Sequence, residues 1–409
     1  MPSSGAEHIS AKFRVRPEPA KALSAPAECR LLRDALQRNP ESPALRLRLA
    51  KLLNLLDCFE ETVALLSSPG IDRLGAEELL TLARALLACR TDEGARAAAG
   101  MAERALRLAS SDADLSIGLA EAAKASFRTG ATAQAVAMLE KALELDPHNS
   151  LACKRLATHL LRTSEPKAVL DLVARLNAKG ASHSRLFASR ILALAQLGQL
   201  KEARELLNLA GFVEEHLLPP PPGWKSIEAF NAAVVEELSS HPGLRFGRYG
   251  TASHKTWRID SPATGAAPAA RALVERISEA VQHHVASLGE RAHPWLKARP
   301  ERAVLASWCV ITAADGFEDW HMHPDGWMTG VYYVEVPDAV CASEDDSGCL
   351  ALGLPEGLIG ETVAKRFGRR MVRPRPGLLA LFPSPSYHRT FPHRSDGRRI
   401  CISFDVKPG

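Results

Sequence analysis

Residues 321–337 read HMHPDGWMTGVYYVEVP and join two closely spaced histidines to a run of β-forming residues. His321 and His323 stand two positions apart, so in an extended segment both imidazoles project from the same face. The run that follows, TGVYYVEV (329–336), is rich in Val and Tyr, which favour strands. We therefore expect a strand next to a pair of candidate metal ligands.

Further short runs of the same type surround this stretch and are separated by clusters of Pro, Gly, Asp and Ser. They are VLASWCVIT (304–312), CLALGL (349–354), LLALF (378–382) and RICISFDV (399–406). Several short strands with such turns favour a sandwich or jelly roll over a parallel sheet. His388 follows LLALF and a turn, 65 residues after His323, so a later strand can supply a third imidazole. Three ligands on one side of a metal leave positions open for chemistry.

The first half of the chain has a different pattern, rich in Ala, Leu, Arg and Glu at helical spacing. Residues 116–149 resemble one tetratricopeptide repeat, with small or helix-ending residues at the matching places: Ala123, Gly130, Ala135, Ala142 and Pro147. Gly130 and Gly198 are 68 residues apart, which is two periods of 34. An irregular helical bundle is the alternative. Stacked repeats form a groove that binds peptides or helices, or they serve as a platform for dimerisation.

Three segments together resemble a known family. They are HMHPDGWMTGVYYVEVP (321–337), PGLLALFPSPSYHRTFP (376–392) and RRICISFDV (398–406). In order, spacing and flanking residues they are similar to the 2-oxoglutarate- and Fe(II)-dependent oxygenases of the double-stranded β-helix fold, in the bacterial branch that often carries tetratricopeptide repeats. The resemblance covers about residues 224–407. It implies a jelly roll that holds Fe(II), takes 2-oxoglutarate and dioxygen as co-substrates, and oxidises a C–H bond.

The resemblance also implies roles for single residues. His388 corresponds to the distal metal histidine, and Arg399 to the arginine that pairs with the far carboxylate of 2-oxoglutarate. A guanidinium suits that task because it can donate two hydrogen bonds to one carboxylate. Arg398 is expected to face the other way and is the weaker candidate. Tyr333 and Ser403 are further candidate hydrogen-bond donors to the co-substrate, with ordinary strand packing as the alternative.

The other two metal ligands can be read in two registers. One uses His321 and His323, and the other uses His323 with Asp325, because many iron oxygenases use His-x-Asp followed by a distant His. We favour His321, His323 and His388, since the position of Asp325 does not look constant in the family branch. Asp325 stays open as an alternative ligand, and a surface pair or a zinc site are alternatives to the iron site. The H-E-x-x-H motif of zinc hydrolases does not occur.

Aromatic residues mark the border between the halves, because every Trp and Tyr lies from Trp224 onward. The run PPPPG (219–223) precedes that point and cannot continue a helix. The expected organisation is an α+β multidomain chain, with an all-α tetratricopeptide-type solenoid before a double-stranded β-helix with flanking helices. Its expected parts are a flexible N-terminal segment (1–27), helical repeats (28–215), a Pro-rich linker (216–223) and the oxygenase domain (224–409).

Composition limits the classes of binding partner that we expect for the chain. The formal net charge of +4 over 409 residues is too weak to indicate nucleic acid. The eight cysteines are dispersed without a C-x-x-C pair, no secretory signal is visible, and no apolar stretch reaches membrane-spanning length, so we expect a cytoplasmic protein without membrane contact.

The fusion to repeats suggests that the oxygenase hydroxylates a side chain of a peptide or protein that the repeats hold. The alternatives are an oxygenase for a free small molecule and a non-catalytic scaffold with a ligand-binding jelly roll. Oligomerisation through the repeats is a further expectation.

Overall fold

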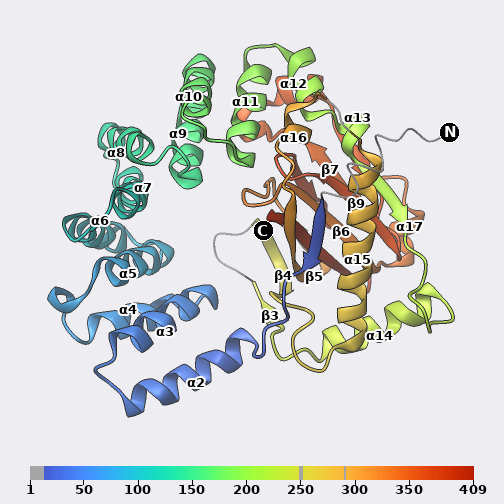
Figure 1. The fold of residues 1–409 in the computed structure, drawn as a ribbon, viewed down its shortest axis with the longest axis horizontal. Helices are drawn as coiled ribbons and strands as arrows, with labels where there is room; N and C mark the ends of the chain where they lie inside the picture. The colour runs from blue at the N-terminus through green and yellow to red at the C-terminus, as the bar shows by residue number, and fades with distance from the viewer. Residues whose placement is uncertain (1–12, 248–251, 290–291) are drawn as a thin grey trace. The chain divides into compact units, whose positions relative to one another are not determined.

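A computed structural model of the chain describes residues 13–247, 252–289 and 292–409. Contacts divide the chain into two compact units (Figure 1). The helical unit comprises Ala25–Ser182, and the described residues of the sheet unit lie within 13–24, 183–247 and 252–409. No helix of the described ranges is long and apolar enough to cross a bilayer. The predicted fold class, helical repeats followed by a jelly roll, is confirmed.

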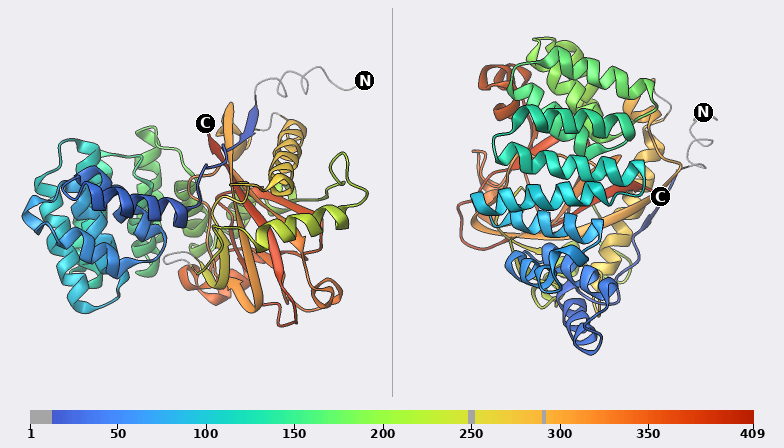
Figure 2. Two further views of the ribbon diagram at one scale, coloured as in Figure 1. Left: turned by 90° about the horizontal axis from the view of Figure 1, so that it is seen from below. Right: turned by 90° about the vertical axis from the view of Figure 1, so that its left-hand side faces the viewer.

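The helical unit is a series of antiparallel helix pairs, and Figure 2 shows its helices stacked side by side. The α-helices are α2 (Ala25–Arg38), α3 (Pro43–Leu55), α4 (Phe59–Ser67), α5 (Ala76–Ala88), α6 (Asp92–Arg107), α7 (Asp112–Arg128), α8 (Thr132–Leu145), α9 (Ser150–Arg162) and α10 (Pro166–Ala178), with a 3-10 turn at Ile71–Arg73. In Figure 1, α5, α7 and α9 line the inner side of the arc that this unit forms, and α6, α8 and α10 line its outer side.

Small residues let these helices approach closely, as the repeat pattern predicts. Ala123, Ala135 and Ala142 are fully buried in the α7–α8 pair. A Cβ on Gly94 would lie 2.7 Å from the Leu86 carbonyl oxygen, so α5 and α6 require glycine there. Gly130 ends the first helix of the pair with a φ of +83°, a conformation that costs glycine little.

The two units divide at Ser182, earlier than the predicted linker at 216–223. Helices α11 (Ser184–Gln196), α12 (Leu200–Leu207) and α13 (Leu209–Phe212) belong to the sheet unit, as does strand β2 (Glu214–Leu217). The reason is bonding to later segments: Gln196 donates to the Leu358 carbonyl, Arg204 donates to the Phe367 carbonyl, and β2 pairs with β9. In the N-terminal segment expected to be flexible, β1 (Arg14–Pro17) pairs with β5, and residues 1–12 lie outside the described ranges.

The sheet unit contains two sheets. The larger runs β2-β9-β6-β11-β5-β4-β3, with β1 on β5, and the smaller runs β10-β7-β8. The strands are β3 (Arg245–Phe246), β4 (Ser253–Ile259), β5 (Arg302–Glu318), β6 (Met328–Glu335), β7 (Leu350–Gly353), β8 (Arg370–Val372), β9 (Leu378–Pro383), β10 (Tyr387–Thr390) and β11 (Arg399–Pro408). The remaining helices are α14 (Ile227–Ser239), α15 (Pro268–Ser287), α16 (Pro294–Lys297), α17 (Asp338–Ala342), α18 (Glu356–Ile359) and α19 (Glu361–Phe367).

Strand β11 separates the two cores of this unit. Its apolar residues Ile400, Ile402, Phe404 and Val406 join the core that includes helices α14 and α15. Its alternate residue Cys401 joins a second core, shared by the larger sheet and the smaller one. Because side chains alternate along a strand, Arg399, Ser403 and Asp405 face the same side as Cys401. A row of polar groups thus lies between the sheets.

Candidate metal centre

Backbone pairing brings the three predicted histidines together. His388 lies on β10, and His321 forms an isolated antiparallel bridge with it. The His321 N–H donates to the His388 carbonyl over 3.0 Å, and the reverse bond measures 2.9 Å. The His323 N–H donates to the Ser384 carbonyl over 3.2 Å. These bonds hold the His-x-His segment against β10 and the turn before it.

The three imidazoles converge on one point. One ring nitrogen from each of His321, His323 and His388 lies within 4.8 Å of the other two. Their ring centroids are separated by 4.2, 4.9 and 5.3 Å. Among the described residues this is the one group of three or more His, Cys, Asp or Glu side chains that could hold a metal ion.

The hydrogen bonds of the rings determine which nitrogen is available. Nδ1 of His321 donates to the Asp319 carbonyl over 2.7 Å, and Nδ1 of His388 donates to the Ser386 carbonyl over 3.0 Å. Nδ1 of His323 lies 2.5 Å from Oδ1 of Asp405. Because a carbonyl or carboxylate oxygen accepts, each Nδ1 carries the proton and each Nε2 keeps its lone pair. The three residues therefore fit a metal bound through Nε2.

Burial keeps the imidazole rings of His321 and His388 neutral. Loss of solvent lowers the pKa of His321 to about 4 and lowers the pKa of His388 well below its usual value. Neutral imidazole is the form that binds metals. Burial alone would raise the pKa of Asp405, but the electrostatic attraction of the His323 ring and its hydrogen bond outweigh this effect, so the pKa of Asp405 is lowered and the carboxylate stays ionised.

The carboxylate at this centre comes from β11. Asp325 is exposed and lies outside the histidine group, so the geometry gives no support to the register of His323 with Asp325. Asp405 contacts the centre instead, through Nδ1 of His323. Sequence reasoning missed Asp405, although the alternation of Arg399, Ser403 and Asp405 in RICISFDV was a signal that could have found it.

Arg399 is buried beside the histidines. Its side chain is 2% exposed, and its Nη1 donates to the Gly348 carbonyl over 2.7 Å. Its Nη2 donates to Oγ1 of Thr390 over 3.2 Å, and Thr390 stands two residues after His388 on β10. These bonds use two of the five N–H donors of a guanidinium, so others remain for a carboxylate.

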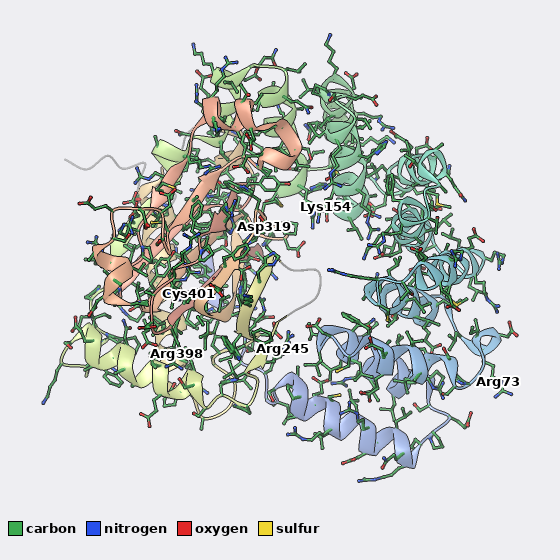
Figure 3. The ribbon with its side chains drawn as sticks, turned by 180° about the vertical axis from the view of Figure 1, so that it is seen from behind. Arg73, Lys154, Arg245, Asp319, Arg398 and Cys401 are labelled. Atoms are coloured by element: carbon green, nitrogen blue, oxygen red, sulfur yellow. The ribbon has the colours of Figure 1, made fainter. Side chains whose placement is uncertain are left out.

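The other candidates for co-substrate contact differ in position. Tyr333 is fully buried on β6, and burial raises the pKa of its hydroxyl. Ser403 is half-buried on β11, on the same face of the strand as Arg399 and Cys401. Figure 3 labels Cys401, together with Asp319 of the segment before His321. Arg398 lies outside the strand and forms an ion pair of 3.5 Å with Glu335.

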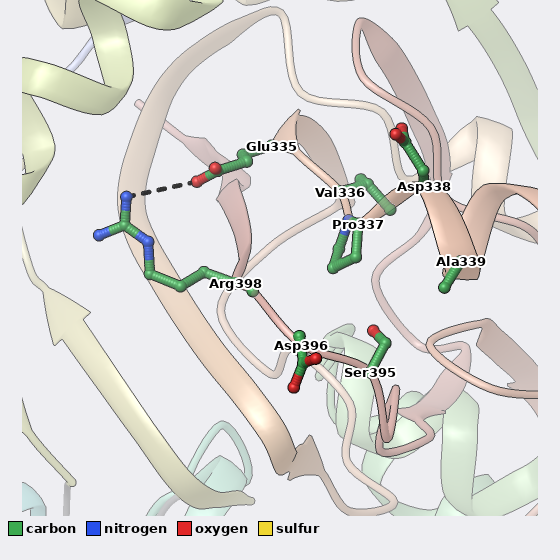
Figure 4. Close-up of a pocket in the computed structure, with 9 residues that line it drawn as sticks. Glu335, Val336, Pro337, Asp338, Ala339, Ser395, Asp396 and Arg398 are labelled. Carbon is green, nitrogen blue, oxygen red and sulfur yellow. Dashed lines mark hydrogen bonds and ion pairs between the residues drawn. The ribbon is translucent and has the colours of Figure 1, made fainter.

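That ion pair borders an open pocket of about 310 Å³, which lies where β6 ends and β11 begins (Figure 4). Three carboxylates line it, from Glu335, Asp338 and Asp396. None of the three histidines takes part in its lining. The pocket is therefore separate from the candidate metal centre.

One wall of the centre carries charged residues that sequence reasoning did not single out. The Trp308 ring lies 5.4 Å from the His323 ring, and the Arg258 guanidinium lies 4.9 Å from the Trp308 centroid. Glu318 accepts from the Ser253 hydroxyl over 2.7 Å, and burial raises the pKa of this carboxyl. These residues come from β4 and β5, and no local motif marks them.

Comparisons with known proteins agree with this architecture. A family model described as "Putative 2OG-Fe(II) oxygenase" matches residues 306–405, and a tetratricopeptide repeat model matches residues 126–190. A search of curated proteins found no match.

Similar solved structures include a prolyl-4-hydroxylase from Pseudomonas putida, with 15% identity and a TM-score of 0.32, over 50% of this chain and 98% of that one. A 2OG-Fe(II) oxygenase family oxidoreductase from Burkholderia pseudomallei has 13% identity and a TM-score of 0.33, over 51% and 90%. YrrB, a tetratricopeptide repeat protein with an unusual peptide-binding site, has 19% identity and a TM-score of 0.30, over 44% and 90%. The chain therefore carries a 2OG-Fe(II) oxygenase domain, matched over the residues that hold the three converging histidines, after tetratricopeptide repeats.

Proposed function

We propose that this oxygenase hydroxylates a side chain of a peptide or protein that the helical repeats hold. The observation that carries the catalytic half of the proposal is the set of three histidines whose Nδ1 atoms all donate to oxygen, leaving three Nε2 lone pairs at one point. The repeats support the substrate half, because their stacked helices offer a surface on which an extended segment can lie.

Each residue of the centre has a task in this proposal. His321, His323 and His388 hold Fe(II) through Nε2. Asp405 keeps the proton of His323 on Nδ1 and, as a nearby carboxylate, reduces the positive charge of a site built from three neutral ligands. Bound Fe(II) supplies, with 2-oxoglutarate and dioxygen, the oxidising power that inserts oxygen into a C–H bond and yields succinate and carbon dioxide.

Arg399 binds the far carboxylate of 2-oxoglutarate, and Tyr333 and Ser403 donate further hydrogen bonds to the co-substrate. The bond of Arg399 to Thr390 supports this assignment, because it fixes the guanidinium next to the strand that carries His388. Burial strengthens such a charge-assisted bond, since little water competes for the carboxylate.

The compartment and the assembly are also proposals. None of the eight cysteines forms a disulfide, which supports a reducing cytoplasm. Self-association would use the repeat surface, and sedimentation of the full chain over a range of concentrations tests it.

The test of activity uses the full chain, loaded with Fe(II) without oxygen. Succinate release after addition of 2-oxoglutarate and air is measured first, and then peptides from a proteolysed lysate are searched by mass spectrometry for the addition of one oxygen atom. Oxygen added to peptides supports the proposal. If oxygen is added only to small metabolites, the proposal of a peptide substrate is wrong and the enzyme acts on a small molecule. Absence of succinate in every mixture would favour the non-catalytic scaffold.

A further inference from the structure

Cationic side chains gather around a single buried carboxylate in the helical unit. Glu121 on α7 pairs with Arg84 of α5 over 3.0 Å and with Arg155 of α9 over 3.0 Å. The Glu121 side chain is 6% exposed, whereas that of Arg84 is 45% exposed. Since α7 contacts both α5 and α9, the group spans three neighbouring helices on the inner side of the arc (Figure 1).

Two more cations extend this group along α7. Lys124 and Arg128 follow Glu121 by three and seven positions, which places them on the same side of the helix. Among the described residues no ion pair joins either of them to a carboxylate. We call the five side chains the basic face: Arg84, Glu121, Lys124, Arg128 and Arg155. Four cations against one carboxylate leave it a net charge of +3.

The surplus charge is costly where it is buried. Burial is the main cause of the lowered pKa of Lys124, and Arg155, Arg84 and Arg128 lower it further, while Glu121 acts in the other direction. Burial likewise lowers the pKa of Arg155, against the attraction of Glu121. A half-buried ammonium surrounded by guanidinium groups destabilises the free protein, and an added carboxylate would relieve that repulsion.

We propose that the basic face binds an acidic segment of the protein substrate, in extended form, through carboxylates that lie between Arg84, Lys124, Arg128 and Arg155. The inference rests on the proposed function, because it assigns the bound segment to the substrate. Neighbouring helices pack about 9 Å apart, which is close to three residues of extended chain, so acidic residues at every third position match the face. Next to the cations, Phe127 and His159 form a ring pair with centroids 5.3 Å apart. These rings can contact the methylene groups of the side chains in such a segment.

The test measures binding without iron, 2-oxoglutarate or oxygen, so that its outcome is independent of turnover. A fluorescent peptide of Glu-Ser-Gly repeats and a matched Gln-Ser-Gly peptide are titrated with the full chain. We expect the Glu peptide alone to bind, with an affinity that falls as salt is raised. The double variant Lys124→Gln with Arg128→Gln retains both ion pairs of Glu121, and it should bind about tenfold more weakly.

The matched control is Arg96→Gln with Arg107→Gln, which removes the same charge from exposed positions on the outer helix α6. It should leave the affinity unchanged. Equal binding of the Glu and Gln peptides, or equal losses in the two double variants, would overturn the proposal. Tighter binding of a single-stranded oligonucleotide than of the Glu peptide would overturn it in favour of a nucleic-acid surface. Binding of the Glu peptide without any succinate release would leave the basic face standing and reject the proposed function instead.

Discussion

The candidate metal centre and the basic face differ in how completely their polar and charged groups are paired. At the metal centre each Nδ1 has an oxygen partner, Asp405 is matched by His323, and Arg399 is held by Gly348 and Thr390. At the basic face two of the four cations, Arg84 and Arg155, pair with Glu121, and among the described residues the other two form no ion pair. The centre is thus arranged in advance around three free lone pairs, whereas the face retains surplus charge.

This difference indicates two kinds of recognition. A centre whose side chains are already oriented loses little freedom when a ligand binds, which suits a metal that needs fixed geometry. A face with unbalanced charge attracts partners of opposite charge from a distance and tolerates variation in their sequence. We therefore expect strict requirements at the centre and graded ones at the face.

The largest expected effect comes from His388→Ala. Loss of one of three ligands should lower the affinity for Fe(II) by more than about 100-fold and abolish succinate release. Iron content after anaerobic loading and a succinate assay measure both. His216→Ala, at a partly exposed histidine on β2, is the matched control and should behave like the unaltered chain. Full iron binding in the His388 variant would show that the three rings do not form the site.

Arg155→Ala tests how much the buried ion pairs of Glu121 stabilise the helical unit. It leaves Glu121 buried with Arg84 alone and should destabilise the unit by about 3 kcal/mol. Hydrogen exchange of α7 and α9 measures the loss locally. Arg175→Ala removes one partner of the exposed pair with Glu140 and should cost less than about 1 kcal/mol. Similar losses in the two variants would mean that burial of Glu121 carries no special cost.

Asp405→Asn tests whether the carboxylate acts through His323. We expect Fe(II) affinity to fall by about 10- to 100-fold with the fold intact, because the amide neither carries charge nor holds the Nδ1 proton as firmly. Iron titration and circular dichroism separate the two effects. Asp338→Asn, at an exposed position of α17, serves as the control. An unchanged affinity in the Asp405 variant would assign this residue a purely structural role.

A smaller effect is expected from pH. Burial lowers the pKa of His284 on α15 from an ordinary value of 6.5 to about 4, so the folded ring stays neutral while the unfolded ring takes up a proton. Stability should therefore be full above pH 6.5 and should fall as the pH drops toward 4, by about 2 kcal/mol between pH 7 and pH 5. Chemical denaturation of the full chain and of His284→Leu at both pH values measures this difference. The same loss in both proteins would contradict the assignment.

Local patterns in the chain were enough to predict the elements and several members of the site. The 34-residue spacing anticipated the helix pairs, because small residues and glycines recur where helices touch and end. Strand alternation predicted that Arg398 faces away from Arg399, and the His-x-His spacing placed two imidazoles together. These features depend on helical and strand periods, which neighbouring residues encode directly.

Contacts between distant segments could not be obtained in this way. Asp405 contacts His323 from 82 residues later, Trp308 of β5 approaches the same imidazole, and Arg258 of β4 lies over the Trp308 ring. The border of the units at Ser182 likewise depends on bonds from α11 and α12 to residues more than 150 positions away. Such partners are chosen by strand order and burial, where each polar group must find a hydrogen bond, and no nearby residue carries that information.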